Sequence, residues 1–178
     1  MNKLSLKSLI FMALCCDLGI IAKKLISPAA DLITDRLHIP GGISTAFSLM
    51  FIVVAAFVVR KFGAALLMGL VQSGIAFLLG SVGSMGVLAP LGYAIPGLII
   101  DICVLELPKT VLKEDVQITA TCAFASIAAC VTANVIVFGL HGAVMLLYGL
   151  VACASGMICG LLAAKLVKLL KKIFKTEK

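Results

Sequence analysis

Long apolar runs, separated by short segments that hold charge, glycine or proline, make up most of this chain. Each run has about the 20 residues that a helix needs to cross the hydrocarbon core of a bilayer. Apolar residues amount to 62% of the sequence and charged residues to 13%, so a soluble fold would expose too much apolar surface. We therefore predict an all-α integral membrane protein with a single six-helix transmembrane domain over residues 1–178. The expected spans are Ser5–Ile26, Ile43–Val59, Phe62–Gly80, Gly86–Leu105, Val116–Gly139 and Gly142–Ala164.

Lysine and arginine are distributed unevenly over the predicted loops. With the N-terminus in the cytoplasm, twelve of the 15 basic residues fall on the inner side, and only Lys23, Lys24 and Arg36 fall on the outer side. By the positive-inside rule, this bias predicts that both termini lie in the cytoplasm. The basic tail, residues 165–178, is expected to extend the last helix and to meet anionic lipids. No nucleic-acid-binding motif accompanies these charges, so we expect no nucleic-acid partner.

The sequence holds no grouping of residues typical of catalysis. The seven cysteines lie within apolar runs, without a C-x-x-C pair, and are expected to be small buried hydrophobic residues. There is no G-x-x-x-x-G-K-[ST] phosphate-binding loop, and no serine or cysteine is grouped with a histidine base. We therefore expect neither enzyme activity nor a cofactor, a metal site or an ATP site in this chain.

Polar side chains inside the predicted spans are costly in lipid and therefore informative. Most of them fall at a similar depth, in the outer half of the membrane. We interpret this set as a small-molecule site in an apolar cavity, with interhelical hydrogen bonding as the alternative. The candidate substrate-binding residues are Gln72, Tyr93, Asn134, His141, Tyr148 and His38.

The fourth predicted span contains an interior proline. Pro96 cannot donate the backbone hydrogen bond that the Gly92 carbonyl would otherwise accept, and it can kink the helix beside Tyr93. A carbonyl freed at this depth needs another partner. The Gly92–Tyr93–Pro96 face is therefore predicted to border a cavity, with a bend that serves only packing as the alternative.

Two aspartates lie within the predicted spans. Asp17 falls deep in the first span, where it is expected to face a cavity, to pair with a lysine such as Lys24, or to be protonated. Asp101 falls near the inner end of the fourth span and is expected to reach water at the membrane interface.

The predicted outer loop Ser27–Gly42 is longer than the other outer turns. Ser27 can cap a short helix that has Pro28 at its first position, and Pro40-Gly41-Gly42 would end that helix. This short helix is a candidate lid over the outer mouth of the bundle; the alternative is an ordinary interfacial connector.

The last span carries a small residue at every fourth position, namely Ala152, Gly156, Gly160 and Ala164. Such a ridge lets another helix approach closely, either within the bundle or in a different membrane protein. Because the ridge has four members and leads into the basic tail, we retain it as a candidate partner surface.

The segment "IPGGISTAFSLMFIVVAAFVVRKFGAALLMGLVQSGIAFLLG", with its basic pair Arg60-Lys61 at an inner turn and the proline-rich span that follows, resembles the substrate-binding S components of energy-coupling factor (ECF) transporters. Within that family it is most similar to the subfamily linked to the thiamine precursor hydroxymethylpyrimidine, also labelled as cobalt-type permease components. The resemblance implies a subunit of the prokaryotic plasma membrane that captures a vitamin at its outer face. It also implies two kinds of partner, a transmembrane coupling protein and two cytoplasmic ATPases.

Members of this family often dock through an alanine pair four residues apart on the first helix. Here Asp17 follows Ala13 at that spacing, and Cys15 and Gly19 offer a substitute pair of small residues. The candidate partner interface is therefore Cys15, Gly19, Ala152, Gly156 and Gly160.

The predicted pocket contains no arginine, which favours an uncharged or cationic heteroaromatic ligand unless Lys23 or Lys24 reaches inward. A small ion or metal permease subunit, and a structural or regulatory subunit without a ligand, remain alternative functions.

Overall fold

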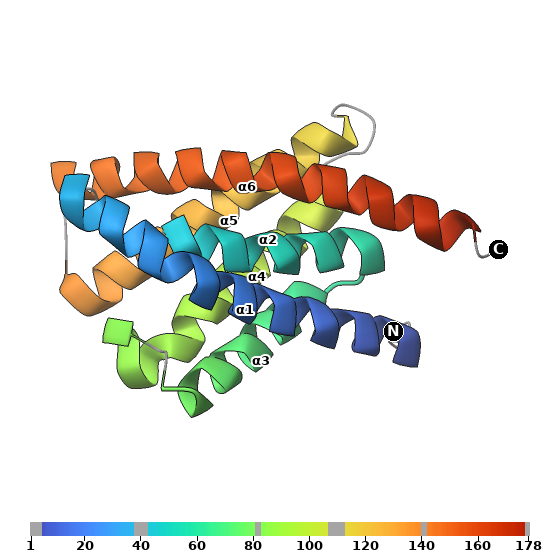
Figure 1. The fold of residues 1–178 in the computed structure, drawn as a ribbon, viewed down its shortest axis with the longest axis horizontal. Coiled ribbons are helices and arrows are strands. Elements are labelled where there is room, and N and C mark those ends of the chain that lie inside the picture. Colours follow the sequence, from blue (N-terminus) through green and yellow to red (C-terminus); the bar gives the residue numbers. More distant parts are fainter. Residues whose placement is uncertain (1–4, 38–42, 81–82, 107–112, 140–141, 177–178) are drawn as a thin grey trace.

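The computed structural model describes residues 5–37, 43–80, 83–106, 113–139 and 142–176, and these ranges are helical with no strand (Figure 1). The all-α prediction is therefore confirmed. A 3-10 segment, η1 (Gly83–Leu88), precedes α4, and a π-helical turn, η2 (Asn134–Phe138), continues α5. The α-helices are α1 (Leu6–Leu37), α2 (Ile43–Val59), α3 (Ala64–Leu78), α4 (Ala89–Glu106), α5 (Glu114–Ala133) and α6 (Ala143–Thr176).

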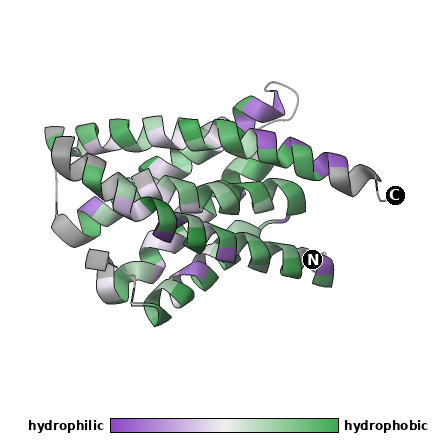
Figure 2. Cartoon of the chain, in the orientation of Figure 1, coloured by the Kyte–Doolittle hydropathy of each residue, from purple (hydrophilic) through white to green (hydrophobic). Residues whose placement is uncertain are grey.

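Three of these helical stretches are long and apolar enough to cross a membrane, namely Gly86–Leu105, Glu114–Ile136 and Val144–Lys172. Ser44–Val59 and Ala64–Leu78 are apolar but shorter. Green, apolar residues follow most of the length of the helices in Figure 2. The prediction of a membrane protein is supported by these helices, whereas the six spans and their orientation stay predictions.

The α2 helix forms the centre of the bundle. It packs against α1, α3, α4, α5 and α6, and Ile52, Val53, Ala55 and Phe57 are almost completely buried along it. Large apolar side chains are exposed instead on the outward faces of α1 and α6, for example Leu14 and Leu150. Apolar residues on both the inside and the outside of a bundle are typical of helices that pack in lipid.

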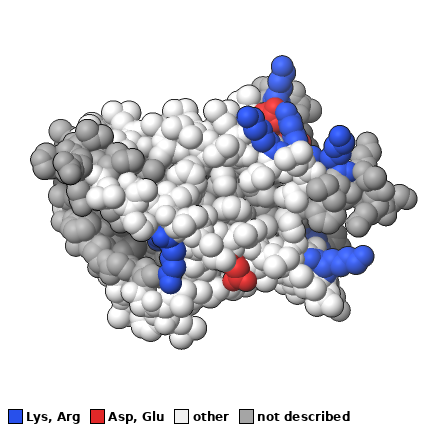
Figure 3. Space-filling view, viewed as in Figure 1, with Lys and Arg blue, Asp and Glu red and all other residues white. Residues whose placement is uncertain are grey.

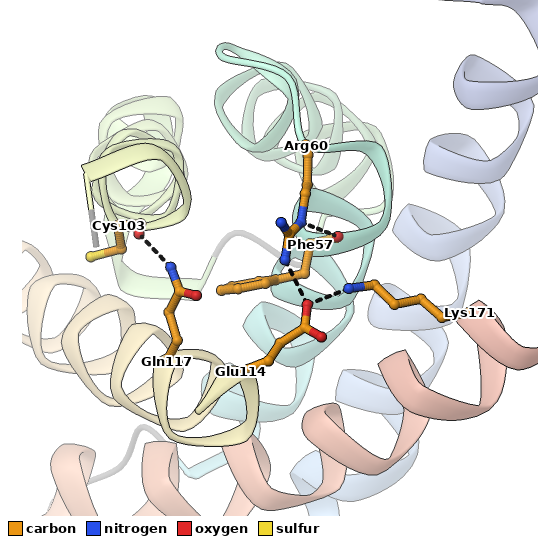
Figure 4. Close-up of polar contacts among 6 residues, drawn as sticks. All are labelled: Phe57, Arg60, Cys103, Glu114, Gln117 and Lys171. Carbon is orange, nitrogen blue, oxygen red and sulfur yellow. Dashed lines mark hydrogen bonds and ion pairs between the residues drawn. The ribbon is translucent and has the colours of Figure 1, made fainter. Parts of the chain in front are cut away.

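Both termini lie at the same end of the bundle (Figure 1). Basic side chains gather over this end, while most of the bundle surface in view is uncharged (Figure 3). Here the Glu114 carboxylate lies 2.6 Å from the Arg60 guanidinium and also pairs with Lys171 (Figure 4). Arg60 follows α2 with a left-handed φ of 49°. The ion pairs therefore join the end of α2 to the start of α5 and to the last part of α6.

The Asp101 side chain is only 2% exposed, so the expectation that it reaches water is wrong. Its two carboxylate oxygens accept hydrogen bonds from the backbone N–H groups of Ala65 and Leu66, each at 3.0 Å. The first N–H groups of a helix have no partner within the helix and favour a negative charge. Gly63, which precedes α3, has no side chain to cap them. Asp101 therefore caps α3 from the neighbouring helix α4.

No separate lid helix begins at Ser27. The α1 helix runs without interruption from Leu6 to Leu37 and has Pro28 in its interior, so the predicted break is wrong. Pro28 removes the hydrogen bond to the Lys24 carbonyl, but the helix continues beyond that single loss. At 1.5 Å per residue, α1 is about 48 Å long and exceeds the roughly 30 Å hydrocarbon core. Pro40-Gly41-Gly42 lies outside the described residues.

Asp17 lies on the outward face of α1, between the exposed residues Leu14 and Leu18. It therefore does not face a cavity, and no ion pair joins it to Lys24. Cys15 and Cys16, by contrast, are buried in the core beside α2.

Candidate binding site

A cavity of about 100 Å³ lies between α1, α2, α4, α5 and α6. The early turns of α2 and α4 and the late turns of α5 form its wall, which places it toward the end of the bundle opposite the two termini. Alanine and glycine supply much of this wall, and their small side chains leave the space open. The lining residues are Lys23, Thr45, Ala46, Ser48, Leu49, Gly92, Tyr93, Ser126, Ala129, Cys130, Ala133 and Ala152.

A second cavity of about 110 Å³ lies beside the first and also borders α3. Lys23, Ser48 and Tyr93 line both cavities, so these three side chains form the partition between them. The remaining lining residues are Ile20, Lys24, Ser27 and Ala76. Each cavity is smaller than the roughly 150 Å³ that holds one benzene ring, so a ligand larger than a single ring does not fit without displacement of the shared side chains.

The polar centre of the partition is a contact between Lys23 of α1 and Tyr93 of α4. The Lys23 ammonium donates a 3.0 Å hydrogen bond to the Tyr93 hydroxyl and lies 5.4 Å from the centre of the tyrosine ring. Both side chains are half-buried. Of the carboxylates whose side chains the structure describes, none pairs with Lys23. The partition thus presents a positive charge to both cavities.

Close packing between α3 and α4 holds the backbone of Tyr93 in place. A Cβ atom added to Gly69 of α3 would lie 2.5 Å from the Tyr93 carbonyl oxygen. Gly97, one turn further along α4, approaches Ala65 in the same way, with 2.9 Å from an added Cβ to the carbonyl oxygen. Glycine at these positions lets the backbones of α3 and α4 come into contact, and this contact fixes the position of the Tyr93 backbone from which the side chain extends.

Gln72 lies behind the partition formed by Lys23, Ser48 and Tyr93 and supports it through hydrogen bonds. Its carboxamide accepts a 3.1 Å hydrogen bond from the Ser48 hydroxyl and donates a 3.4 Å hydrogen bond to the Cys16 carbonyl. The side chain has no exposed surface. Gln72 therefore joins α1, α2 and α3, and it orients Ser48 at the cavity surface without lining the cavity itself.

The interior proline of α4, Pro96, is buried one turn away from the cavity residue Gly92. Gly92 lines the first cavity, and Pro96 is almost completely buried without being part of the lining. Because proline has no N–H, the Gly92 carbonyl lacks its usual partner one turn later. The predicted cavity face is therefore present at Gly92 and Tyr93 and absent at Pro96.

The structure separates the other predicted substrate-binding residues from this cavity. The Asn134 amide turns back along its own helix and donates to the Cys130 carbonyl at 2.9 Å. Asn134 is 6% exposed but is not part of the cavity wall, and Tyr148 is half-buried away from it. His38 and His141 lie outside the described residues. Of the predicted residues that the structure describes, only Tyr93 lines the cavity, with Gln72 behind it.

The residues predicted for a partner interface are used within the bundle. A Cβ atom added to Gly156 would lie 2.8 Å from the Cα of Ala123, and one added to Gly160 would lie 2.6 Å from the Cα of Thr119. The small-residue ridge of α6 therefore packs against α5. Gly19 contacts Gln72 and Ser48, and Cys15 and Ala152 are 5% exposed. In this arrangement none of the five residues offers an open surface to another protein.

The sequence did not predict Ser48 and Ser126 as lining residues, and it left open whether Lys23 reaches inward. Lys23 was counted among the outer charges, and the structure shows that it lines both cavities. Ser126 is 5% exposed, and its hydroxyl has no hydrogen-bond partner among the described residues. A serine among alanines gives no signal of a lining position in a sequence, because its hydroxyl can bond to its own helix.

Comparison of the chain with models of protein families, with curated proteins and with solved structures finds no match. The class rests on the fold: over the described residues, an all-helical protein with helices of membrane-spanning length and a cavity between them.

Proposed function

We propose that this chain is the membrane-embedded substrate-binding subunit of an ECF-type importer, as its sequence resemblance implies. It captures a vitamin or vitamin precursor with a single heteroaromatic ring, such as hydroxymethylpyrimidine, at the outer face. A transmembrane coupling protein and two ATPases then drive delivery to the cytoplasm. The observation that carries this proposal is the pair of adjacent cavities that share Lys23, Ser48 and Tyr93.

The position of the cavities supports capture from outside. They lie toward the end opposite the termini, and the charge bias predicts that the termini are cytoplasmic. The small volume and the mixture of one aromatic ring, one ammonium and hydroxyl groups suit a small polar ring. The inward position of Lys23 also changes the expected ligand, because a positive charge in the wall disfavours a cationic ring.

An ion or metal permease has less support. A cation pathway needs a succession of polar or acidic groups along a pore. Among the described residues, the Asp101 carboxylate accepts hydrogen bonds from the first N–H groups of α3, and Asp17 lies on the outward face of α1. Neither carboxylate lines the two cavities.

The proposal is tested by purifying the protein in mild detergent and identifying released small molecules by mass spectrometry. A second arm measures the unfolding temperature with a panel of vitamins and their precursors. We expect one compound to copurify or to raise the unfolding temperature, and Tyr93→Ala to abolish that effect. Tyr148→Ala is the matched control, because Tyr148 lies away from the cavity. If no compound copurifies and none stabilises the protein, the binding function is refuted.

A further inference from the structure

The strongest unexplained feature of the cavities is the set of hydrogen-bond donors at their partition. An ammonium carries three N–H donors, and Lys23 uses one of them on the Tyr93 hydroxyl. The Tyr93 oxygen accepts that bond, so its own hydrogen remains available. Two N–H groups of Lys23 and the O–H group of Tyr93 are therefore available on side chains that line both cavities.

Three available donors with a net positive charge favour an acceptor that carries negative charge. A carboxylate has two oxygens with about four acceptor positions and no donor. A charge that is partly removed from water is costly unless it is paired, and no carboxylate among the described side chains pairs with Lys23. A bound carboxylate would supply both the missing charge and the missing acceptors.

A second polar group lies on another wall of the first cavity. The Ser126 hydroxyl of α5 has no hydrogen-bond partner among the described residues, although it is 5% exposed. The oxygen itself has almost no accessible surface and would lie 2.8 Å from a Cβ atom added to Gly156 of α6, so it faces that helix and does not contact a molecule in the cavity. The remainder of the wall is mostly alanine, glycine and leucine, which favours an apolar ring beside the polar partition.

We propose that the site selects a small ring that bears a carboxylate, with the carboxylate against Lys23 and Tyr93 and the ring against the apolar wall of the first cavity. This inference rests on the proposed function, since it names the class of substrate for the same site, and it disfavours the hydroxymethylpyrimidine given there as an example, because that molecule bears no carboxylate. It differs from the expectation of an uncharged or cationic ligand that the absence of arginine suggests. Lys23 is a binding residue on this view, and Gln72 is a positioning residue that acts through Ser48.

The test uses three compounds that share one ring and carry a negative, neutral or positive substituent at the same position: pyridine-3-carboxylate, pyridine-3-carboxamide and 3-(aminomethyl)pyridine, with the corresponding pyrimidine series beside them. Binding to the full-length protein in detergent is measured by calorimetry and by the shift in unfolding temperature at pH 7. We expect the carboxylate of at least one series to bind at least tenfold more tightly than its amide. The amine, which would oppose Lys23, should show no measurable binding.

The variants Lys23→Gln, Lys23→Arg and Tyr93→Phe identify the donors. Lys23→Gln should weaken carboxylate binding by about tenfold or more, because it removes the charged partner, and should change amide binding by less than threefold. Lys23→Arg should retain the preference, and Tyr93→Phe should reduce it. Lys165→Gln, an exposed lysine on the far part of α6, is the control and should have no effect.

The outcomes separate this inference from the proposed function. Tighter binding of the amide or the amine than of the carboxylate overturns the carboxylate assignment and leaves ligand binding intact. A carboxylate preference that survives Lys23→Gln also overturns it. The wild-type comparison needs no variant, so it decides the matter even where a variant fails to fold. Failure of all compounds in every charge class to bind counts against the site as a whole.

Discussion

The carboxylate of Asp101 on α4 accepts a 3.0 Å hydrogen bond from the backbone N–H of Ala65 at the start of α3. Its second oxygen accepts an equal bond from the next residue along α3. The side chain that caps α3 is therefore supplied by α4. It also lies on the same side of α4 as Gly97, one turn earlier, where α3 and α4 touch backbone to backbone.

Asp101→Ala should lower the free energy of unfolding by about 3 kcal/mol, because two hydrogen bonds to a charged group are lost at a buried helix start. Asp101→Asn keeps one acceptor oxygen and should lose less, about 1 kcal/mol. Titration with SDS in mixed micelles measures both values. Asp17→Asn serves as the control, since Asp17 lies on the outward surface, and it should change stability by less than about 0.5 kcal/mol. An Asp101→Ala protein as stable as the wild type would refute the capping role.

Gly69→Ala should destabilise the protein by about 1–3 kcal/mol, because its added Cβ would meet the Tyr93 carbonyl oxygen and force α3 away from α4. Gly74→Ala on the same helix is the matched control, since an added Cβ there has no neighbour within 4 Å. That change should be neutral or stabilising, as alanine has the higher helix propensity. The unfolding titration distinguishes the two variants, and equal effects at both positions would contradict the close approach.

Gly156→Ala should destabilise the isolated protein by about 1–3 kcal/mol, because the α6 ridge packs against the α5 backbone within the bundle. Gly149→Ala on the same helix is the matched control and should be neutral, since a Cβ atom added there has no neighbour within 4 Å. A ridge that serves only a partner protein would give the opposite result. The isolated protein would then be unaffected by Gly156→Ala, and only the assembled complex would be weakened.

Glu114→Gln should lower stability by about 1 kcal/mol or less, although it removes both ion pairs that join α5 to Arg60 and Lys171. The side chains are about one-third exposed, and water and salt weaken pairs of this kind. The loss of stability caused by Glu114→Gln should therefore become smaller as the salt concentration rises from about 50 mM to about 500 mM. A double-mutant cycle with Arg60→Gln isolates the pair. A coupling energy that does not change with salt would show that the pair acts as a buried one.

Local sequence predicted the helices well where apolar length and helix-breaking residues decide them. The predicted span Ile43–Val59 coincides with α2, and Pro90 falls in the first turn of α4, where a proline costs little. The basic tail continues the last helix to Thr176. The break at Pro28 was wrong, since one lost hydrogen bond did not end α1.

The sequence by itself determined that the chain is helical and apolar, and that polar side chains within its helices are few. Only the tertiary structure decided that Lys23 turns toward Tyr93, that Asp101 caps another helix, and that Asn134 bonds to its own helix. The physical reason is that helices that are apolar on all sides have no polar stripe to reveal which face is inside. In such a bundle the rotation of each helix follows from close packing with its neighbours, and those contacts join residues far apart in the chain.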